Sequence, residues 1–338
     1  MNAKQDQHHE RDHQREQHLP NEQTHVGVDA GHTVAYLGPS GTFTEQAAHT
    51  LAQPGAATLP VSTVQQGVDM LVQRHVGSAV VPFENSVEGS VSVTLDALIR
   101  GEPLVITGEA HVAVRFALLA RRGSTAADLR RIATHPHAEA QTREWVGRHF
   151  PTATIVPESS TAHAAELVAA GEYDAAIAGP LAAQRHDLEV LHDDIADRPG
   201  AITRFVRLSL PVPPPPPTGA DTTTLVGFLR HNHPGALLEL LQQFVGRGVD
   251  LTRLESRPTG EALGQYCFAI EANGHISESR MAEALTGLRR CCADVRYLGS
   301  YPRADGYKHP IPPEASEIAY QHAWSWVTSL TQDAQPSS

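Results

Sequence analysis

The chain has 338 residues, of which 41% are hydrophobic and 19% are charged, and this length predicts about two domains with buried cores. It carries 26 Lys and Arg against 38 Asp and Glu, which gives a formal net charge of −12. This balance excludes a broad basic surface for nucleic acid or anionic lipid, so an anionic ligand must be bound by a local site.

The cysteines and the hydropathy pattern favour a cytoplasmic protein. Cys267, Cys291 and Cys292 are odd in number and two are sequence neighbours, so no disulfide framework can be written. The chain has no run of about 18 apolar residues, and we expect no membrane contact. Residues 1–32 lack the apolar segment of a signal peptide and predict a disordered polar tail. A metal site among its histidines is not favoured, because their irregular spacing lacks partner ligands.

In residues 33–210, short apolar runs alternate with Ala-rich helical patterns. The apolar runs are residues 34–37, 78–81, 113–120, 154–156, 175–178 and 188–191, and the helical patterns are residues 44–51, 91–99, 126–132 and 162–170. This alternation is typical of α/β layers around largely parallel sheets. We expect one two-lobed α/β domain, which a late strand at residues 204–210 closes.

A proline-rich segment then separates two domains. Pro211 and residues 213–217 cannot continue a sheet ladder, and they predict a polyproline spacer of about 3.1 Å per residue. We interpret residues 211–221 as a linker. The alternative, a docking motif for a proline-binding domain, lacks a flanking Arg-rich motif.

Residues 222–303 predict strand, helix, strand, strand, helix and strand in that order. The strands are residues 223–228, 251–257, 265–271 and 295–299, and the helices are residues 235–247 and 278–290. This order indicates a ferredoxin-like βαββαβ unit. The extension at residues 304–338 is expected to contain one amphipathic helix at residues 318–330.

Small hydroxyl and amide residues gather where predicted strands run into helices. In the first junction, Ser40, Gly41 and Thr42 precede a helix. Free N–H groups and the positive end of the helix dipole can bind a carboxylate or phosphate there. The alternative is an ordinary helix cap with Glu45 in the first turn.

Three further junctions repeat this pattern, at the strand ends where ligands of open α/β sheets bind. The second and third contain Asn85 and Ser86, and Ser160, Thr161 and Ala162. The fourth is Thr203, Arg204 and Phe205, in which Arg204 offers a guanidinium fork for a carboxylate. The alternative for Arg204 is a surface ion pair with Asp194 or Asp197.

Several familiar catalytic motifs do not occur in the sequence. It has no GxxxxGK[ST], GxGxxG, HExxH, CxxC or GxSxG pattern, which disfavours nucleotide, zinc and acyl-enzyme chemistry. His135 and His137 flank Pro136, and this segment indicates a helix start rather than a metal site.

Six motifs in chain order resemble the prephenate dehydratase family across residues 34–303. They are YLGPSGTFTEQAA (residues 36–48), VVPFENSVEGSVSVTLDAL (80–98), HPHAEAQ (135–141), ITRFVRL (202–208), GALL (235–238) and ESRP (255–258). The last two resemble the phenylalanine-binding motifs of the ACT regulatory module. The resemblance implies a two-lobed periplasmic-binding-protein-like catalytic domain (residues 33–210) followed by a ferredoxin-like ACT domain (residues 222–303). Residues 1–32 are too short and polar for a chorismate mutase domain, so a monofunctional enzyme is expected.

The resemblance implies conversion of prephenate into phenylpyruvate, CO2 and water in phenylalanine biosynthesis. Because formation of an aromatic ring drives this reaction, no metal or organic cofactor is expected. The family implicates the Thr of its TRF motif, here Thr203, in protonating the departing hydroxyl. Arg204 is expected to orient the site or a carboxylate, and Phe205 completes the motif.

The same resemblance assigns the other site residues. Substrate carboxylates are expected at helix N-termini and at Ser40, Gly41, Thr42, Asn85, Ser86, Ser160, Thr161 and Ala162. His137 stands where the family commonly has Gln, which affects fine specificity more than the reaction. A carboxylate beside a dianion is repulsive, so we interpret Glu88 as a structural or hinge residue.

L-Phenylalanine is the effector that the resemblance implies, bound at a subunit interface of a homodimer or homotetramer. The residues expected to bind it are Gly235, Ala236, Leu237, Glu255, Ser256, Arg257 and Pro258. Two rival functions stay open at this point. One is arogenate dehydratase, which removes the same groups from a substrate with an amine in place of the ketone, and the other is a non-catalytic ligand sensor.

Overall fold

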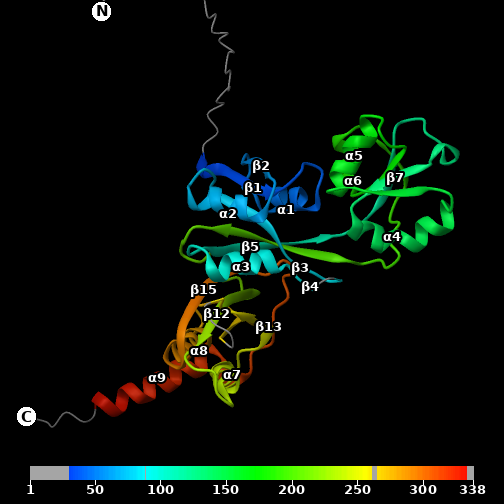
Figure 1. The fold of residues 1–338 in the computed structure, drawn as a ribbon. Coiled ribbons are helices and arrows are strands. Elements are labelled where there is room, and N and C mark those ends of the chain that lie inside the picture. Colours follow the sequence, from blue (N-terminus) through cyan, green and yellow to red (C-terminus); the bar gives the residue numbers. More distant parts are fainter. Residues whose placement is uncertain (1–29, 88, 261–264, 333–338) are drawn as a thin grey trace, which may run out of the picture.

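The first lobe is built on a mixed sheet, sheet A, in the computed structural model, which describes residues 30–87, 89–260 and 265–332 (Figure 1). The strands are β1 (Thr33–Leu37), β2 (Ala57–Val61), β3 (Ser78–Asn85), β4 (Gly89–Ser90), β5 (Val105–Ala113) and β11 (Ile202–Ser209). Their order is β2-β1-β3-β11-β5, with β4 paired to β3. β11 is antiparallel to both β3 and β5, whereas β1 is parallel to β2 and β3.

Helices cover both faces of sheet A because its strands are apolar on both sides. Helix α1 (Phe43–Leu51) packs on the face that carries Tyr36 and Phe205. Helices α2 (Val64–Val72) and α3 (Ser92–Arg100) pack on the opposite face, which carries Val81 and Val206. Consecutive residues of β11 therefore face different layers of the protein.

The second lobe is a similar layered unit built on sheet B. Its strands are β6 (Ala117–Ala120), β7 (Arg131–Thr134), β8 (Thr154–Pro157), β9 (Ala175–Ala178) and β10 (Glu189–His192), in the order β10-β6-β9-β7-β8. Helix α4 (Pro136–His149) covers one face, and α5 (Thr161–Ala169) and α6 (Pro180–Arg185) cover the other. The chain crosses between the lobes after β5 and again before β11, where the Val114 N–H donates to Ala201 O at 2.7 Å.

The third domain is an antiparallel sheet, sheet C, with two helices on one face. Its strands are β12 (Asp221–Leu229), β13 (Leu251–Pro258), β14 (Tyr266–Asn273) and β15 (Cys292–Pro302), in the order β13-β14-β12-β15. Helices α7 (Ala236–Val245) and α8 (Ser279–Cys291) pack on the outer face. The element order is the predicted βαββαβ order.

Sheet C packs face to face against sheet A through a shared hydrophobic core. Leu298 and Tyr301 of sheet C lie in one cluster with Phe83, Ile106 and Val206 of sheet A, and all five side chains are buried. Two domains that share a core in this way cannot separate without exposing it.

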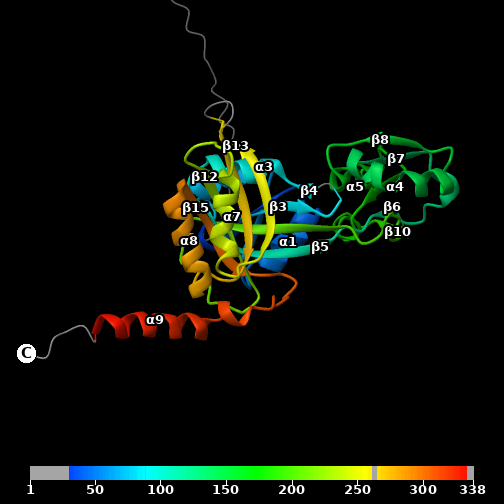
Figure 2. The same cartoon turned by 90° about the horizontal axis from the view of Figure 1, so that it is seen from below.

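The extension after sheet C contains one long helix, α9 (Glu317–Gln332), close to the predicted helix at residues 318–330. It projects away from the sheets (Figure 2), and Trp324 and Trp326 are exposed. Three short 3-10 helices complete the elements: η1 (Ala30–His32), η2 (Ala126–Asp128) and η3 (Pro313–Ala315). Among the described residues, no helix has the length and apolar character needed to cross a membrane.

Three expectations for residues 33–210 are wrong. Residues 126–132 do not form a helix, because Ile132 and Ala133 are fully buried inside sheet B as part of β7. The run 113–120 is two strands, since the chain leaves sheet A after β5 and enters sheet B at β6. The sheets are mixed rather than largely parallel. In sheet A, β11 returns antiparallel from the second lobe, and in sheet B, β6 is antiparallel to β9 and β10. Of the tail expected at residues 1–32, residues 1–29 lie outside the described residues, and residues 30–32 form η1.

Candidate active site

A cavity of about 380 Å³ lies between the two lobes and receives residues from both. All four predicted junctions contribute to it, but the fourth, at Thr203, is the start of strand β11 and not a strand-to-helix junction. The predicted residues that line it are Thr42, Asn85, Ser160, Thr161, Thr203 and Phe205. The tertiary fold therefore brings together short polar segments that lie up to 161 positions apart in the sequence, as residues 42 and 203 do.

Three helix N-termini meet at this cavity. Thr42, His135 and Ser160 are the N-cap residues of α1, α4 and α5, and all three line the cavity. Each caps its helix by accepting a backbone N–H through its side chain. The remaining N–H groups of the first turns and the helix dipoles make such termini favourable positions for anions.

The cavity is otherwise poor in charge. None of the described residues that line it is Asp, Glu, Lys or Arg, and the side chains there that can carry positive charge are His135 and His137. Their rings pack edge to face with centroids 4.9 Å apart. A dianionic ligand in this cavity would therefore be held by backbone dipoles, hydroxyls and imidazoles instead of guanidinium or ammonium groups.

Thr203 is oriented toward the cavity by Asn85 on the neighbouring strand. The side-chain Oδ1 of Asn85 accepts the N–H of Val87 at 2.8 Å, so its Nδ2 is the donor to Thr203 Oγ1, also at 2.8 Å. Because Oγ1 accepts from Asn85, the hydroxyl hydrogen of Thr203 is left to donate elsewhere. Asn85 therefore holds the Thr203 hydroxyl in place, and this hydroxyl can donate a hydrogen bond to a ligand in the cavity.

Ser40 and Ser86, two of the predicted binding residues, lie outside the lining of the cavity and form hydrogen bonds beside it. Ser40 Oγ lies 3.0 Å from the hydroxyl of Tyr36. The N–H of Ser86 donates to Ile202 O, and its Oγ accepts the N–H of Ile202, both at 2.9 Å. The two bonds between Ser86 and Ile202 fix the turn after β3 against β11.

Gly41 and Ala162 form a close contact between the lobes. Gly41 has φ of +91°, and a Cβ built there would lie 3.5 Å from Ala162 and 3.3 Å from Ala182. The Gly41 N–H donates to Glu45 Oε2 at 2.6 Å, and Glu45 also pairs with Arg185 of the second lobe. Gly41 and Ala162, which were predicted to bind substrate, are not among the lining residues of the cavity; their small size instead allows the two lobes to approach each other closely.

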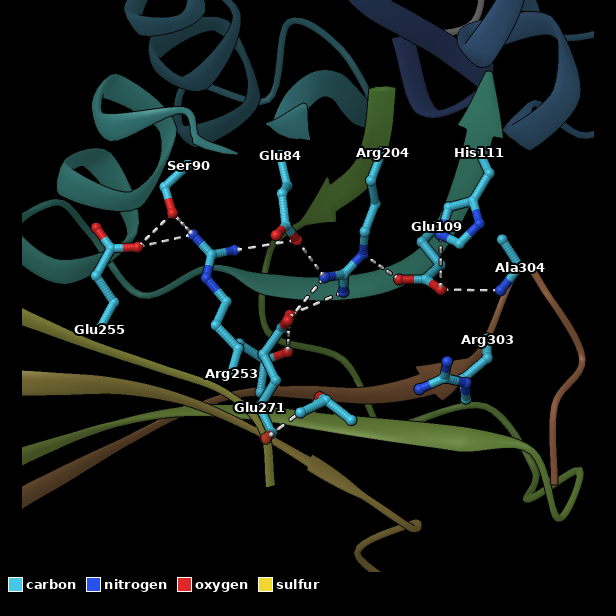
Figure 3. Close-up of polar contacts among 12 residues, drawn as sticks. Glu84, Ser90, Glu109, His111, Arg204, Arg253, Glu255, Glu271, Arg303 and Ala304 are labelled. Carbon is cyan, nitrogen blue, oxygen red and sulfur yellow. Dashed lines mark hydrogen bonds and ion pairs between the residues drawn. The ribbon is translucent and has the colours of Figure 1, made fainter. Parts of the chain in front are cut away.

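Arg204 points to the opposite side of sheet A, away from the cavity. Its guanidinium contacts Glu109 and Glu271 (Figure 3), so the geometry argues against the expected contact with a substrate carboxylate. The alternative pairing with Asp194 or Asp197 is also not found, since Asp197 instead accepts the N–H groups of Glu144 and Trp145.

The segments expected to bind an effector lie on two different elements of the third domain, α7 and β13. Gly235 is the N-cap of α7 in a left-handed conformation, and Ala236 and Leu237 begin that helix. Residues 255–258 lie on β13, where Glu255 Oε2 accepts from Ser90 Oγ at 2.5 Å and Arg257 pairs with Asp96 at 2.6 Å. These contacts join the end of sheet C to β4 and α3.

The β7–α4 junction lines the cavity but is absent from the predicted site residues. His135, His137 and Gln141 all line the cavity, although the residues alone predict only a helix start there and the family resemblance gave His137 an effect on fine specificity. The signal was present, because this is one more strand-to-helix junction with polar residues. Glu88, interpreted as structural, lies outside the described residues.

The comparisons with known proteins agree with this geometry. A family model described as prephenate dehydratase matches residues 34–211. A curated prephenate dehydratase from Amycolatopsis methanolica is 44% identical over 303 residues, which cover 89% of this chain and 99% of the relative.

Two solved structures resemble both the catalytic and the C-terminal parts. A prephenate dehydratase from Arthrobacter aurescens in complex with L-Phe is 46% identical, with a TM-score of 0.82 over 89% of this chain and 99% of that one. GqqA, described as a novel type of quorum quenching acylase, is 34% identical with a TM-score of 0.73 over 80% and 97%. The chain belongs to the prephenate dehydratase family.

Proposed function

We propose that this member of the family is a lyase that converts prephenate into phenylpyruvate, CO2 and water in phenylalanine biosynthesis. The observation that carries the assignment is the inter-lobe cavity, which Thr203 lines together with the N-cap residues of three helices. Prephenate has two carboxylates and a ring hydroxyl. The helix N-termini suit the carboxylates, and Thr203 suits the hydroxyl.

In the proposed mechanism, Thr203 donates a hydrogen bond to the departing ring hydroxyl. The bond between the ring and CO2 breaks, its electron pair moves into the ring, and the C–O bond breaks on the opposite side. Hydroxide is a poor leaving group, so a positioned proton donor accelerates its departure by about 10² to 10⁴. Because a threonine hydroxyl is a weak acid, Thr203 relays a proton from water, and Asn85 holds its oxygen in place.

The two lobes are proposed to form a periplasmic-binding-protein-like domain at residues 33–210, and residues 222–303 an ACT regulatory domain. The relative from Arthrobacter aurescens was solved in complex with L-Phe, which supports L-Phe as effector here. We place it at residues 235–237 and 255–258, brought together across a subunit interface of a homodimer or homotetramer. A ligand that shifts Glu255 would reach the cavity through Ser90, which pairs with Glu84 next to Asn85.

Replacing Thr203 by Val tests the catalytic assignment. The variant keeps the shape of the side chain but loses the hydroxyl, so kcat for prephenate is expected to fall by about 10² to 10⁴. Thr203→Ser retains the donor and should retain most of the activity. The readout is phenylpyruvate absorbance in alkali.

Thr223→Val is the matched control, because Thr223 is another buried strand threonine, bonded to Gly274 O at 2.7 Å in the third domain. Near-normal turnover by folded Thr203→Val would refute the assignment. Product from arogenate but not prephenate would identify an arogenate dehydratase, and binding without product would identify a sensor.

Replacing His137 by Ala tests how the substrate anion is held. His137 is one of two described lining residues that can carry positive charge, and a hydrogen bond to a charged group contributes about 1.5 kcal/mol or more. KM for prephenate should therefore rise by about 10-fold with little change in kcat. His149→Ala, on the same helix but outside the cavity, is the control. An unchanged KM in His137→Ala would contradict this use of the residue.

The double variant Glu255→Ala, Arg257→Ala tests the effector site. Both side chains sit on β13 in contacts with the catalytic domain, and their loss should abolish L-Phe inhibition and weaken L-Phe binding in calorimetry. Arg289→Ala is the control, since Arg289 makes an exposed pair with Asp294. Intact binding and inhibition in the double variant would place the effector elsewhere.

A further inference from the structure

A charged cluster is buried between sheets A and C. Arg204 of β11 lies at its centre, between Glu109 and Glu271 (Figure 3). We call these three residues and Tyr301, which also contacts Arg204, the Arg204 cluster. The side chains of Glu109 and Glu271 are each 4% exposed, and Tyr301 is fully buried. Arg204 and Glu109 come from β11 and β5 of the first lobe, whereas Glu271 and Tyr301 belong to the third domain.

All three nitrogens of the Arg204 guanidinium donate hydrogen bonds. Nε donates to Glu109 Oε2 at 2.5 Å, and Nη1 and Nη2 donate to the two oxygens of Glu271 at 2.7 and 2.8 Å. Nη2 also donates to the hydroxyl of Tyr301 at 3.0 Å, and Nη1 lies 3.6 Å from Glu84 Oε2. A two-point contact of this kind fixes direction as well as distance, which a single ammonium group cannot do.

Glu271 is held as a carboxylate by this arrangement. Burial tends to raise the pKa of Glu271, but the charge and hydrogen bonds of Arg204, with the charge of Arg253, hold that pKa below its ordinary value. Thr224 on the adjacent strand adds a hydrogen bond at 3.2 Å. The third domain thus presents a fixed anion to β11.

The strands that carry the cluster also carry the proposed catalytic hydroxyl. On β11, Thr203 is paired with Asn85 and Arg204 with Glu84, so consecutive residues of two strands face the cavity and the cluster in turn. The register of β3 against β11 shifts directly after Arg204. Such a bulge is a local irregularity whose geometry depends on its side-chain contacts.

Stability alone is a poor reason for this cluster. Hydrophobic side chains already join the two sheets around it, and well-packed apolar residues of similar volume hold a buried interface at least as well as an ion pair. What a bidentate arginine adds is a defined position for the strand that bears it.

We propose that Arg204 is a positioning residue for the dehydration: by binding Glu271 of the third domain, it fixes β11 so that Thr203 is correctly placed in the cavity. This inference rests on the proposed role of Thr203. It makes the docking of the third domain part of the catalytic geometry, because the anion that holds Arg204 comes from sheet C.

The first test compares Glu271→Gln, Arg204→Lys and Arg204→Gln with the wild type in steady-state assays on prephenate. A displacement near 1 Å can lower a rate by about 100-fold, so kcat is expected to fall by about 10- to 100-fold while KM changes little. Arg204→Lys keeps the charge and should retain more activity than Arg204→Gln. If Arg204→Lys or Glu271→Gln fails to fold, Tyr301→Phe removes one contact of Arg204 without changing volume and should lower kcat by a smaller factor.

Arg296→Lys is the matched control for loosening of the domain interface. Arg296 of β15 also reaches across, donating to Leu98 O at 2.9 Å and Gly101 O at 2.8 Å, but it touches no member of the Arg204 cluster. Its kcat should stay at the wild-type value. Folded Arg204→Lys and Glu271→Gln enzymes with wild-type kcat, or an equal loss in Arg296→Lys, would overturn the inference.

The second test combines Glu271→Gln with Thr203→Val. If Arg204 acts through Thr203, Glu271→Gln lowers kcat in the wild type but not in the Thr203→Val background. An equal loss in both backgrounds would overturn the route through Thr203. Failure of the site assignment itself has a different signature, which is near-normal kcat in the Thr203→Val variant alone.

Discussion

One strand, β11, carries the constraint on which the catalytic geometry depends. Successive side chains of a strand point to opposite faces, so a strand in the middle of sheet A necessarily contacts two different environments. Thr203 and Phe205 face the inter-lobe cavity, and Arg204 faces the third domain. The placement of one hydroxyl is therefore linked by a single peptide unit to the packing of a separate domain.

The cavity binds its anion in a way that suits an acidic protein. A chain with a net charge of −12 gains no long-range attraction for a dianion, so affinity must come from the site itself. Helix N-termini supply partial positive charge that is fixed in direction and needs no reorganisation during the reaction. Two nearby arginines, Arg204 and Arg253, instead form contacts between the first lobe and the third domain.

Much of this organisation could be predicted from the sequence because it depends on local patterns. The strand-to-helix junctions carried hydroxyl and amide residues at known positions, and parallel strands bring such ends to one edge of a sheet. Thr42 and Asn85 of the first lobe and Ser160 of the second accordingly line one cavity, whereas Thr203 reaches it from the start of the antiparallel strand β11. The βαββαβ order of the third domain could also be predicted from the sequence, because each of its helices has an apolar stripe and residues that mark where a helix begins and ends.

The parts that could not be predicted depend on tertiary contacts. The sequence predicts that Arg204 orients the site or a carboxylate, but only the pairing of β11 with β3 and β5 decides which face of the sheet it occupies. Glu271, its partner, lies 67 residues away in another domain. The Ala-rich sequence of residues 126–132 predicts a helix. In the structure, Ile132 instead forms part of strand β7, where it is buried inside sheet B.

The most direct measurement is a crystal structure of the Thr203→Val variant with prephenate bound, since loss of the hydroxyl should slow turnover enough to trap substrate. The account predicts prephenate in the inter-lobe cavity, with its carboxylates at the N-termini of α1, α4 or α5 and its ring hydroxyl within about 4 Å of the side chain at position 203. Prephenate bound outside this cavity, or with its ring hydroxyl directed away from β11, would contradict the account.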